Sequence, residues 1–294
     1  MGALDGKAVV ITGAGRGLGE AYAVHTAAAG AAVVVNDVDG EQAEAVAARI
    51  VAHGGRAVAS VASVRDPEQA SGIVRQCLTE FGRLDGLVNN AAVSHLALPW
   101  AEDPDAAREL IEVNVLGVLY CGIAAMQVMR AQRAGSIINI SSGSSFGQYA
   151  LGTYAASKGA VASLTYSWAL DLAELGVRVN GVCPLAWTRL VEQHPAAQAR
   201  VTRQRTPDRV APLITYLLSD RAEGITGQLI RFTGDQLHIV RQPAIKEPVL
   251  ARASWSTEDI AVAFDEVLDH HLEPFGLDKR LPPRLQAAIS QPTD

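Results

Sequence analysis

The chain has 294 residues, with 31 Asp and Glu against 25 Lys and Arg and a formal net charge of −6. This length suits one large α/β domain or two small ones, and the mild acidity gives no reason to expect nucleic acid or an anionic membrane as a partner. No uninterrupted apolar run approaches the roughly 18 residues of a membrane span, and the N-terminus lacks the features of a signal peptide. We therefore expect a cytoplasmic protein.

The cysteines are few, far apart and odd in number. They indicate reduced, mostly buried thiols of an intracellular protein rather than a disulfide framework. A metal site or a catalytic thiol is the less favoured interpretation, and we expect no metal. The three are Cys77, Cys121 and Cys183.

Short Val- and Ile-rich runs alternate with longer amphipathic ones through most of the chain. The short runs are apolar throughout, which is typical of strands buried on both faces of a parallel sheet. The alternation predicts a doubly wound α/β fold of about seven strands, with right-handed crossovers and helices on both faces. We predict strands at 7–12, 31–36, 57–61, 86–89, 136–140, 177–182 and 228–232, and helices at 17–29, 40–53, 67–81, 105–131, 153–175 and 207–219.

The pattern changes after residue 234. Residues 235–250 are expected to be irregular, whereas 256–272 have broadly helical apolar spacing and a candidate cap at Ser256 or Thr257. Prolines at 274, 282 and 283 break up the remainder. We expect a main domain at 1–234 and a C-terminal extension at 235–294, too small for its own core, that packs on the domain or on a neighbouring subunit.

The first predicted strand runs directly into a glycine-rich turn and then into a helix. The turn reads Thr-Gly-x-x-x-Gly-x-Gly, with Thr12, Gly13, Gly17 and Gly19 at the fixed positions. Glycines permit a tight turn and a close approach to a pyrophosphate, and the helix N-terminus adds unpaired N–H groups and a favourable dipole. We interpret the turn as a dinucleotide site; a glycine-rich turn without a ligand is the alternative.

The second strand run is followed by Asp37, 18 residues after Gly19. An acid at this place can accept hydrogen bonds from the adenosine ribose and repels the 2′-phosphate of NADP. Arg16 favours the opposite choice, because a guanidinium there could meet that phosphate; it could also be a solvated side chain. We expect NAD as the cofactor, with NADP less favoured.

Tyr154 and Lys158 are four residues apart and would share one face of a helix. A neighbouring cation favours phenolate, so Lys158 should lower the pKa of Tyr154 and make the tyrosine a plausible acid or base near neutral pH. Alone, such a pair could equally be a solvated helix face. Its weight comes from the motifs upstream.

Together with Asn89-Asn90-Ala91-Ala92 after the fourth strand and Ser142 after the fifth, these motifs resemble the short-chain dehydrogenases/reductases. The resemblance covers about residues 5–234. It implies a Rossmann-type domain, a NAD(P) cofactor, a homotetramer or homodimer, and a catalytic tetrad. The tetrad would be Asn114, Ser142, Tyr154 and Lys158.

The resemblance also implies a role for each member. Tyr154 would be the general acid/base toward the substrate oxygen, and Ser142 would hydrogen-bond that oxygen. Lys158 would bind the nicotinamide ribose, and Asn114 would hold a helix irregularity and a water on the proton path. The implied cofactor-binding set is Gly13, Arg16, Gly17, Leu18, Gly19, Asp37, Val64, Asn90, Ala91, Tyr154, Lys158, Pro184, Trp187 and Thr188.

Some positions depart from the family pattern. Ser142 lies one residue closer to Tyr154 than usual and Ser141 lies at the usual distance, although alignment on the strand favours Ser142. Ser63 stands where an aspartate often meets the adenine, which weakens that contact. Leu185 follows Pro184 in place of a glycine and makes the nicotinamide wall bulkier.

Three predicted loops, 93–100, 143–152 and 185–206, should face the substrate. Their largely apolar side chains suit an apolar secondary alcohol or ketone, although each residue could instead pack its own loop. The predicted lining is His95, Ser144, Tyr149, Leu185 and Trp187. For His95, a structural role is favoured over that of a second acid/base. The arginines of the last loop could bind a carboxylate or the phosphates of a CoA ester, or form a solvated helix face: Arg189, Arg200, Arg203 and Arg205.

We therefore expect an NAD-dependent oxidoreductase that interconverts an apolar secondary alcohol, such as a hydroxysteroid or a 3-hydroxyacyl-CoA, and its ketone. Residues 33–37 and 207–212 are similar to the hydroxyacyl-CoA dehydrogenase part of multifunctional enzymes. One alternative is an NADP(H)-preferring ketone reductase. The other is a nucleotide-binding regulator without turnover.

Overall fold

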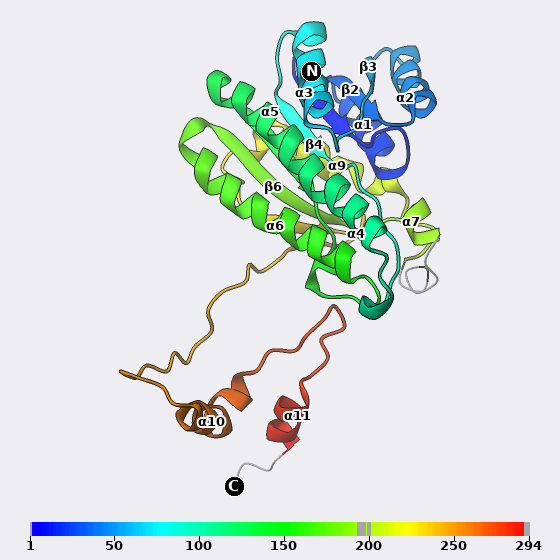
Figure 1. The fold of residues 1–294 in the computed structure, drawn as a ribbon. Helices are drawn as coiled ribbons and strands as arrows, with labels where there is room; N and C mark the ends of the chain where they lie inside the picture. Colours follow the sequence, from blue (N-terminus) through cyan, green and yellow to red (C-terminus); the bar gives the residue numbers. More distant parts are fainter. Residues whose placement is uncertain (1, 193–197, 199–200, 291–294) are drawn as a thin grey trace.

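An eight-stranded sheet forms the centre of the molecule, with helices on both faces (Figure 1). The structure is a computed structural model that describes residues 2–192, 198 and 201–290. The strand order is β3-β2-β1-β4-β5-β6-β7-β8; the first seven strands are parallel, and β8 is antiparallel to β7. The doubly wound sheet is therefore confirmed. Its strands are β1 (Ala8–Thr12), β2 (Ala32–Asp37), β3 (Arg56–Val61), β4 (Gly86–Asn89), β5 (Gly135–Ile140), β6 (Val177–Pro184), β7 (Leu229–Phe232) and β8 (Leu237–Ile239).

Two layers of helices cover the sheet. One core contains α1 (Gly17–Ala28), α2 (Gly40–Ala52) and α9 (Ala211–Leu218), and the other contains α3 (Pro67–Phe81), α5 (Gly117–Gln132) and α6 (Gly152–Leu172). Neighbouring residues of β1 enter opposite cores, Val9 the first and Val10 the second. Burial on both faces explains the continuous apolar runs of the sequence. The three cysteines are buried and free, as predicted.

The order of the strands fixes the place of the functional loops. In register, Ile11 of β1 lies between Val35 of β2 and Val88 of β4. The chain thus adds β2 and β3 on one side of β1, and then crosses back to add β4 and the later strands on the other side of β1. A crevice forms where the connections diverge, outside the carboxyl ends of the strands. All the predicted motif loops leave the sheet at this edge.

The predicted helix at 105–131 is continuous but not regular. It consists of α4 (Pro104–Ile111), a π-helical segment (Glu112–Leu116) and α5. By length and composition alone the span Pro104–Gln132 could cross a membrane. Its buried residues, such as Cys121 and Ala125, instead pack in the core beside α3 and α6, and a core helix of a domain passes the same test.

Short helical segments fill several connections. They are η1 (Pro99–Ala101), η3 (Gly143–Phe146), η4 (Ala173–Leu175), α7 (Arg189–Glu192), η5 (Pro207–Arg209) and η6 (Asp220–Ala222).

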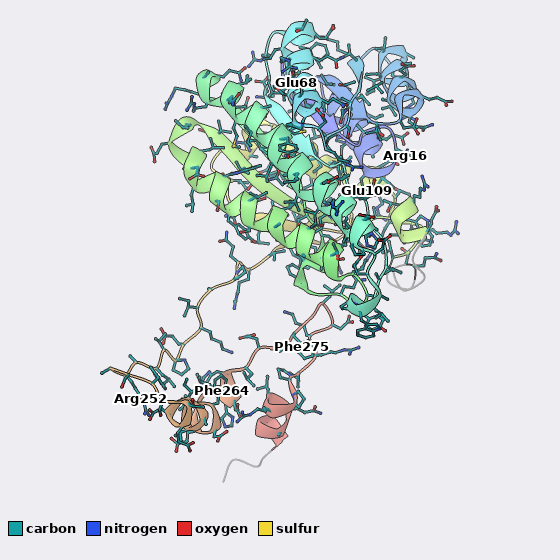
Figure 2. All side chains as sticks on the ribbon, viewed as in Figure 1. Arg16, Glu68, Glu109, Arg252, Phe264 and Phe275 are labelled. Carbon is teal, nitrogen blue, oxygen red and sulfur yellow. The ribbon has the colours of Figure 1, made fainter. Side chains whose placement is uncertain are left out.

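The C-terminal extension leaves the sheet after β8 and runs away from the body of the molecule (Figure 1). Its helices are α10 (Thr257–Glu266), η7 (Leu268–His271) and α11 (Pro283–Ser290). Arg252 and Phe264 lie on the part that stands apart (Figure 2). Among the described residues of the extension only Ala263 and Leu285 are buried.

Two details of the extension differ from the predictions. Residues 235–250 are not wholly irregular, because β8 hydrogen-bonds to the edge of the sheet. Its exposed three residues carry too little pattern to be recognised as a strand. Pro283 does not break the remainder but begins α11, since proline is tolerated in the first turn of a helix. Within the predicted helix at 256–272, α10 forms over Thr257–Glu266 with Ser256 as its cap, and the 3-10 helix η7 follows at Leu268–His271.

Candidate active site

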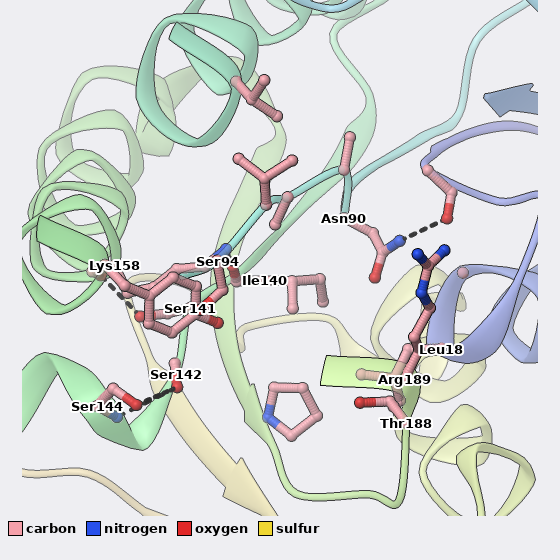
Figure 3. Close-up of a pocket in the computed structure, with 18 of the residues that line it drawn as sticks. Leu18, Asn90, Ser94, Ile140, Ser141, Ser142, Ser144, Lys158, Thr188 and Arg189 are labelled. Atoms are coloured by element: carbon pink, nitrogen blue, oxygen red, sulfur yellow. Dashed lines mark hydrogen bonds between the residues drawn. The ribbon is translucent and has the colours of Figure 1, made fainter. Parts of the chain in front are cut away.

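A single deep crevice brings most of the predicted site residues together. It has a volume of about 860 Å³ and follows the carboxyl edge of the sheet (Figure 3). The predicted residues that line it are Gly13, Arg16, Leu18, Gly19, Asp37, Val64, Asn90, Ala91, Ser142, Ser144, Tyr154, Lys158, Pro184, Leu185 and Thr188.

Gly13 and Gly19 of the glycine-rich turn are packed too tightly to carry side chains. Gly13 has a φ of +61°, and a Cβ there would lie 2.7 Å from the Cα of Ala91. A Cβ on Gly19 would collide with the carbonyl oxygen of Gly13. Gly17 also has a positive φ, at +60°, but lies outside the lining of the crevice. The backbone of the turn and the N-terminus of α1 are therefore left open to a ligand.

Asn90 and Thr12 fasten this turn to the neighbouring strand. The Asn90 amide donates to the carbonyl oxygens of Thr12 and Gly13, each at 2.9 Å. In return, the Thr12 hydroxyl accepts from the backbone N–H groups of Asn90 and Ala91 at 3.0 and 3.1 Å. These four bonds hold the ends of β1 and β4 in a fixed relation, so the floor of the nucleotide site is preformed.

Asp37 ends β2 and is buried at the edge of the crevice. Its carboxylate accepts from the N–H groups of Gly15 at 2.9 Å and Asp39 at 3.1 Å. Arg16 pairs with Asp39 at 3.1 Å, and both side chains are partly exposed. The carboxylate thus has a fixed position, whereas the guanidinium is already partly neutralised by an acid.

Tyr154 and Lys158 lie one turn apart near the start of α6. Lys158 is buried and its ammonium donates to the carbonyl oxygen of Ile140 at 2.8 Å. Its Nζ lies 5.8 Å from the centre of the Tyr154 ring. Burial lowers the pKa of Lys158 to about 8, because a low-dielectric surrounding disfavours the charged form.

The pKa of Tyr154 differs from the sequence prediction. Burial raises it to about 12, and a hydrogen bond with Ser142 lowers it by a smaller amount. Lys158 does not overcome this effect, because its ammonium is directed to the backbone of β5 and its own charge is disfavoured by burial. The prediction that Lys158 lowers the pKa of Tyr154 is therefore wrong for the protein without a bound cofactor.

The two neighbouring serines have different surroundings. Ser141 is buried and donates to the Lys158 carbonyl oxygen at 2.8 Å. Ser142 caps η3, accepts from the Ser144 N–H at 3.1 Å, and hydrogen-bonds the Tyr154 phenol. Ser142 and Ser144 are both within the crevice (Figure 3). The geometry favours Ser142 as the serine that acts beside the tyrosine.

Asn114 lies in the π-helical segment and is fully buried. Its amide oxygen accepts from the Val93 N–H at 2.9 Å, while its amide nitrogen donates to the Val93 carbonyl at 2.9 Å and to Ser157 Oγ at 3.1 Å. The side chain does not line the crevice. It holds the loop after β4 against α6, one turn from Tyr154.

Three predicted lining residues lie outside the crevice lining. His95 contacts Glu102, whose other oxygen accepts from Thr153 at 2.7 Å. His95 therefore has a structural partner that the sequence did not reveal. Tyr149 is largely exposed, and Trp187 donates to Glu192 at 2.9 Å while Arg203 stacks on its ring at 4.9 Å.

The arginines of the last loop also separate. Arg189 and Arg205 line the crevice, and Arg189 extends toward Leu18 and Asn90 (Figure 3). Arg205 pairs with Asp235 at 3.5 Å. Arg200 lies outside the described residues.

The sequence analysis missed two residues that line the substrate end. Arg231 comes from β7, and Leu277 comes from the extension. An arginine inside an otherwise apolar strand was a signal that could have been noticed. Leu277 carried none, because its place depends on a hairpin about 130 residues after the loop it meets.

The geometry fits a nicotinamide dinucleotide. The backbone of the glycine turn lines the crevice without side chains at Gly13 and Gly19, and Asp37 lies at the end of the neighbouring strand, as an adenosine ribose requires. The crevice continues from there to Ser142 and Tyr154. The nicotinamide ring of such a cofactor, which donates or accepts the hydride, would thus lie beside Tyr154, the candidate proton donor.

Comparisons with known proteins agree with this assignment. A short chain dehydrogenase family model matches residues 7–196. A 3-oxoacyl-[acyl-carrier-protein] reductase of Synechocystis is 35% identical over 242 residues, which are 80% of this chain and 98% of that protein.

Two solved structures are similar as well. A short chain dehydrogenase from Mycobacterium avium superimposes with a TM-score of 0.82 at 30% identity, covering 96% of this chain and 98% of the other. A gluconate 5-dehydrogenase from Burkholderia cenocepacia, in complex with NADP and tartrate, gives a TM-score of 0.72 at 33% identity, with 79% and 95% covered. Because the Mycobacterium avium structure covers 96% of this chain, the superposition includes most of the C-terminal extension at 235–294.

Proposed function

The chain belongs to the short chain dehydrogenase family, and from this premise we propose that it is an NAD-dependent oxidoreductase acting on apolar secondary alcohols and their ketones. An oxidoreductase that interconverts alcohols and ketones is what the family establishes. The choice of cofactor and substrate is our inference.

The observation that carries the proposal is the alignment of Ser142, Tyr154 and Lys158 at one end of the crevice. A bound nicotinamide supplies the transfer of hydride. Ser142 holds the substrate oxygen beside Tyr154, which takes the hydroxyl proton during oxidation and returns it during reduction. Lys158 is cationic below its pKa of about 8 and stabilises the negative charge that develops on the phenol oxygen.

We infer a preference for NAD from the surroundings of Asp37. In this proposal the buried carboxylate would face the 2′-phosphate of a bound NADP, and a second negative charge there is unfavourable. The competing residue, Arg16, is paired with Asp39. The gluconate 5-dehydrogenase holds NADP, which makes an NADP(H)-preferring reductase the second candidate.

An apolar substrate suits the side chains at the catalytic end. Leu151, Leu185, Val191, Val201 and Leu277 line the crevice there. A hydroxysteroid or a 3-hydroxyacyl thioester presents the apolar surface that such a wall buries. The 3-oxoacyl-[acyl-carrier-protein] reductase is named for the second kind of substrate.

A homodimer or homotetramer and a cytoplasmic location are also proposed. Ile123 on α5 and Leu170 on α6 are exposed apolar residues on the outer helix layer, and Leu170 is 80% exposed. A second copy could bury them. The free, buried cysteines suit a reducing compartment. Residues 235–294 would serve the main domain as an extension rather than as a second domain.

The test is reduction of NAD⁺ and NADP⁺ with a panel of secondary alcohols, comparing the wild type with Tyr154→Phe. We expect turnover with NAD⁺ that Tyr154→Phe abolishes while NADH binding persists. Turnover that survives in Tyr154→Phe would refute the role of the tyrosine. Tight NADH binding without turnover of any alcohol or ketone would instead support a nucleotide-binding regulator.

A further inference from the structure

Arg231 is a half-buried cation at the substrate end of the crevice. It lies on β7 opposite Cys183 of β6, at the carboxyl edge of the sheet. Its guanidinium lies against Gly143, so closely that a Cβ on this glycine would collide with Nη1. Because Gly143 follows Ser142 directly, the cation lies beside the residue that would hold the reacting oxygen.

This guanidinium has no partner within the part of the chain that the structure describes. Arg231 makes no hydrogen bond or ion pair there. The exposed Arg189, which also lines the crevice, likewise has none among the described residues, whereas the other three crevice arginines each pair with an acid. Arg16 pairs with Asp39, Arg65 with Glu109 and Glu112, and Arg205 with Asp235.

The acids of the crevice are at its other end. Among the described residues that line it, the carboxylates are Asp37 and Glu109. Asp37 ends β2, and Glu109 pairs with Arg65 beside the predicted adenine position. The substrate end thus has an uncompensated positive charge. A half-buried cation without a partner is unfavourable for folding alone, and such an arrangement is expected where a ligand completes the pair.

Leu277 makes the surroundings of Arg231 apolar. It belongs to a hairpin of the extension in which Phe275 and Arg280 exchange two backbone hydrogen bonds, at 2.8 and 2.9 Å. The Leu277 N–H donates to the Gly147 carbonyl oxygen at 2.6 Å, which fastens the hairpin to the loop after β5. Its Cδ1 lies 3.8 Å from the position of a Cβ on Gly143. An ion pair formed beside this side chain would be less screened by water.

We propose that Arg231 binds a carboxylate of the substrate and selects secondary alcohols and ketones that carry one. The inference rests on the proposed function, because it assigns the second contact of a substrate whose carbinol lies at Ser142 and Tyr154. A guanidinium pairs with a carboxylate through two parallel hydrogen bonds. The substrate is then a hydroxy or keto acid with an apolar body, held at both ends.

A carboxylate is favoured over the phosphates of a carrier thioester by position. The Arg231 guanidinium lies against Gly143, the residue that follows Ser142 in the chain, so an anion bound to it would belong to the reacting portion of the substrate. In a carrier thioester, such as a CoA ester, the phosphates are separated from the reacting carbon by a long flexible arm. These phosphates would therefore lie nearer the mouth of the crevice than Arg231.

The first experiment compares hydroxycyclohexanecarboxylates with their methyl esters, which have the same carbinol but no charge. We expect the wild type to prefer the acid in kcat/KM by about 30-fold or more. Arg231→Met should lower kcat/KM for the acid about 10- to 100-fold and bring the acid-to-ester ratio close to one. Arg231→Lys, which keeps the charge but loses the paired geometry, should retain part of the preference.

A matched control is Arg221→Met. Arg221 is an exposed arginine on η6 that lies outside the crevice, so this variant should keep the acid-to-ester ratio of the wild type. Equal use of acid and ester by the wild type would overturn the proposal, and so would an equal loss for both in Arg231→Met. A 3-hydroxyacyl-CoA that loses more than the acid in Arg231→Met would also overturn it, since the anion would then be a phosphate.

Direct binding separates this proposal from the proposed function. Calorimetry would follow cyclohexanecarboxylate added to the full-length protein, with and without NADH, for the wild type, Arg231→Met and Arg221→Met. Binding that is lost only in Arg231→Met supports the carboxylate site even if no alcohol is turned over. Binding that is equal in all three proteins, or absent from the wild type, overturns the site whether or not the enzyme is active.

Discussion

The two halves of the crevice are built in different ways. The nucleotide half comes from residues 12–91, and its polar groups bond mainly to one another: Asp37 to the glycine turn, and Asn90 to Thr12 and Gly13. The substrate half comes from 140–158, 184–205, Arg231 and Leu277, which are far apart in the sequence. The polar groups of one half are thus paired within it, while the other half has a half-buried cation that makes no hydrogen bond or ion pair with any residue that the structure describes. The difference suits a constant cofactor and a variable substrate.

The largest effect is expected at the junction of the two halves. Tyr154→Phe removes the proton donor and keeps the ring, so kcat should fall about 10²- to 10⁴-fold. The dissociation constant of NADH should stay close to that of the wild type, because the phenol oxygen is directed to Ser142. Steady-state kinetics and NADH fluorescence would measure the two quantities. A parallel loss of NADH binding would mean that the halves are not separable at this residue.

The nucleotide half is tested by Asp37→Asn. The amide keeps an oxygen that can accept from the Gly15 N–H but removes the negative charge. We expect the ratio of kcat/KM for NAD⁺ over NADP⁺ to fall about 10- to 100-fold, through loss of charge-assisted bonds to the ribose and of repulsion toward the phosphate. Asp39→Asn, which frees Arg16, is the comparison variant. An unchanged ratio in Asp37→Asn would favour the NADP(H)-preferring alternative.

The pH dependence tests the electrostatics of the junction. Because burial raises the pKa of Tyr154 to about 12, the phenolate that must accept a proton is a small fraction near neutral pH. That fraction rises about tenfold per pH unit below the pKa, so kcat/KM for alcohol oxidation should rise from about pH 7 to about pH 8. Above that pH the rise should level off, because Lys158 loses the charge that stabilises the phenolate, while ketone reduction should change little up to about pH 8. A plateau of the oxidation rate near pH 7 would show that the bound cofactor lowers the tyrosine pKa.

The smallest effect is expected far from the crevice, in the extension. Ser256 and Asp259 form a capping box at the start of α10, with bonds of 3.1 and 3.0 Å to each other's backbone N–H groups. Ser256→Ala should cost about 1 kcal/mol in the stability of this helix and leave kcat unchanged. Faster hydrogen exchange of the α10 amides would report the effect. A fall in kcat of similar size would show that α10 is coupled to the hairpin that carries Leu277.

The same contrast explains how far sequence reasoning reached. The parallel sheet, the glycine turn, Asp37 and the Tyr154–Lys158 pair depend on local spacing or strand patterns, and these could be predicted. Burial was not visible in the sequence, which is why the pKa of Tyr154 was expected to fall rather than rise. The partner of His95 and the positions of Arg231 and Leu277 depend on contacts between distant segments. No periodicity encodes such contacts.

The hairpin at residues 275–280 also has a consequence for the order of synthesis. Every residue that forms the nucleotide half has left the ribosome long before Leu277 is made. The cofactor site can therefore fold on the growing chain while one wall of the substrate site is still missing. The wall of the substrate site becomes complete only after Leu277 has been made and its N–H reaches the Gly147 carbonyl oxygen.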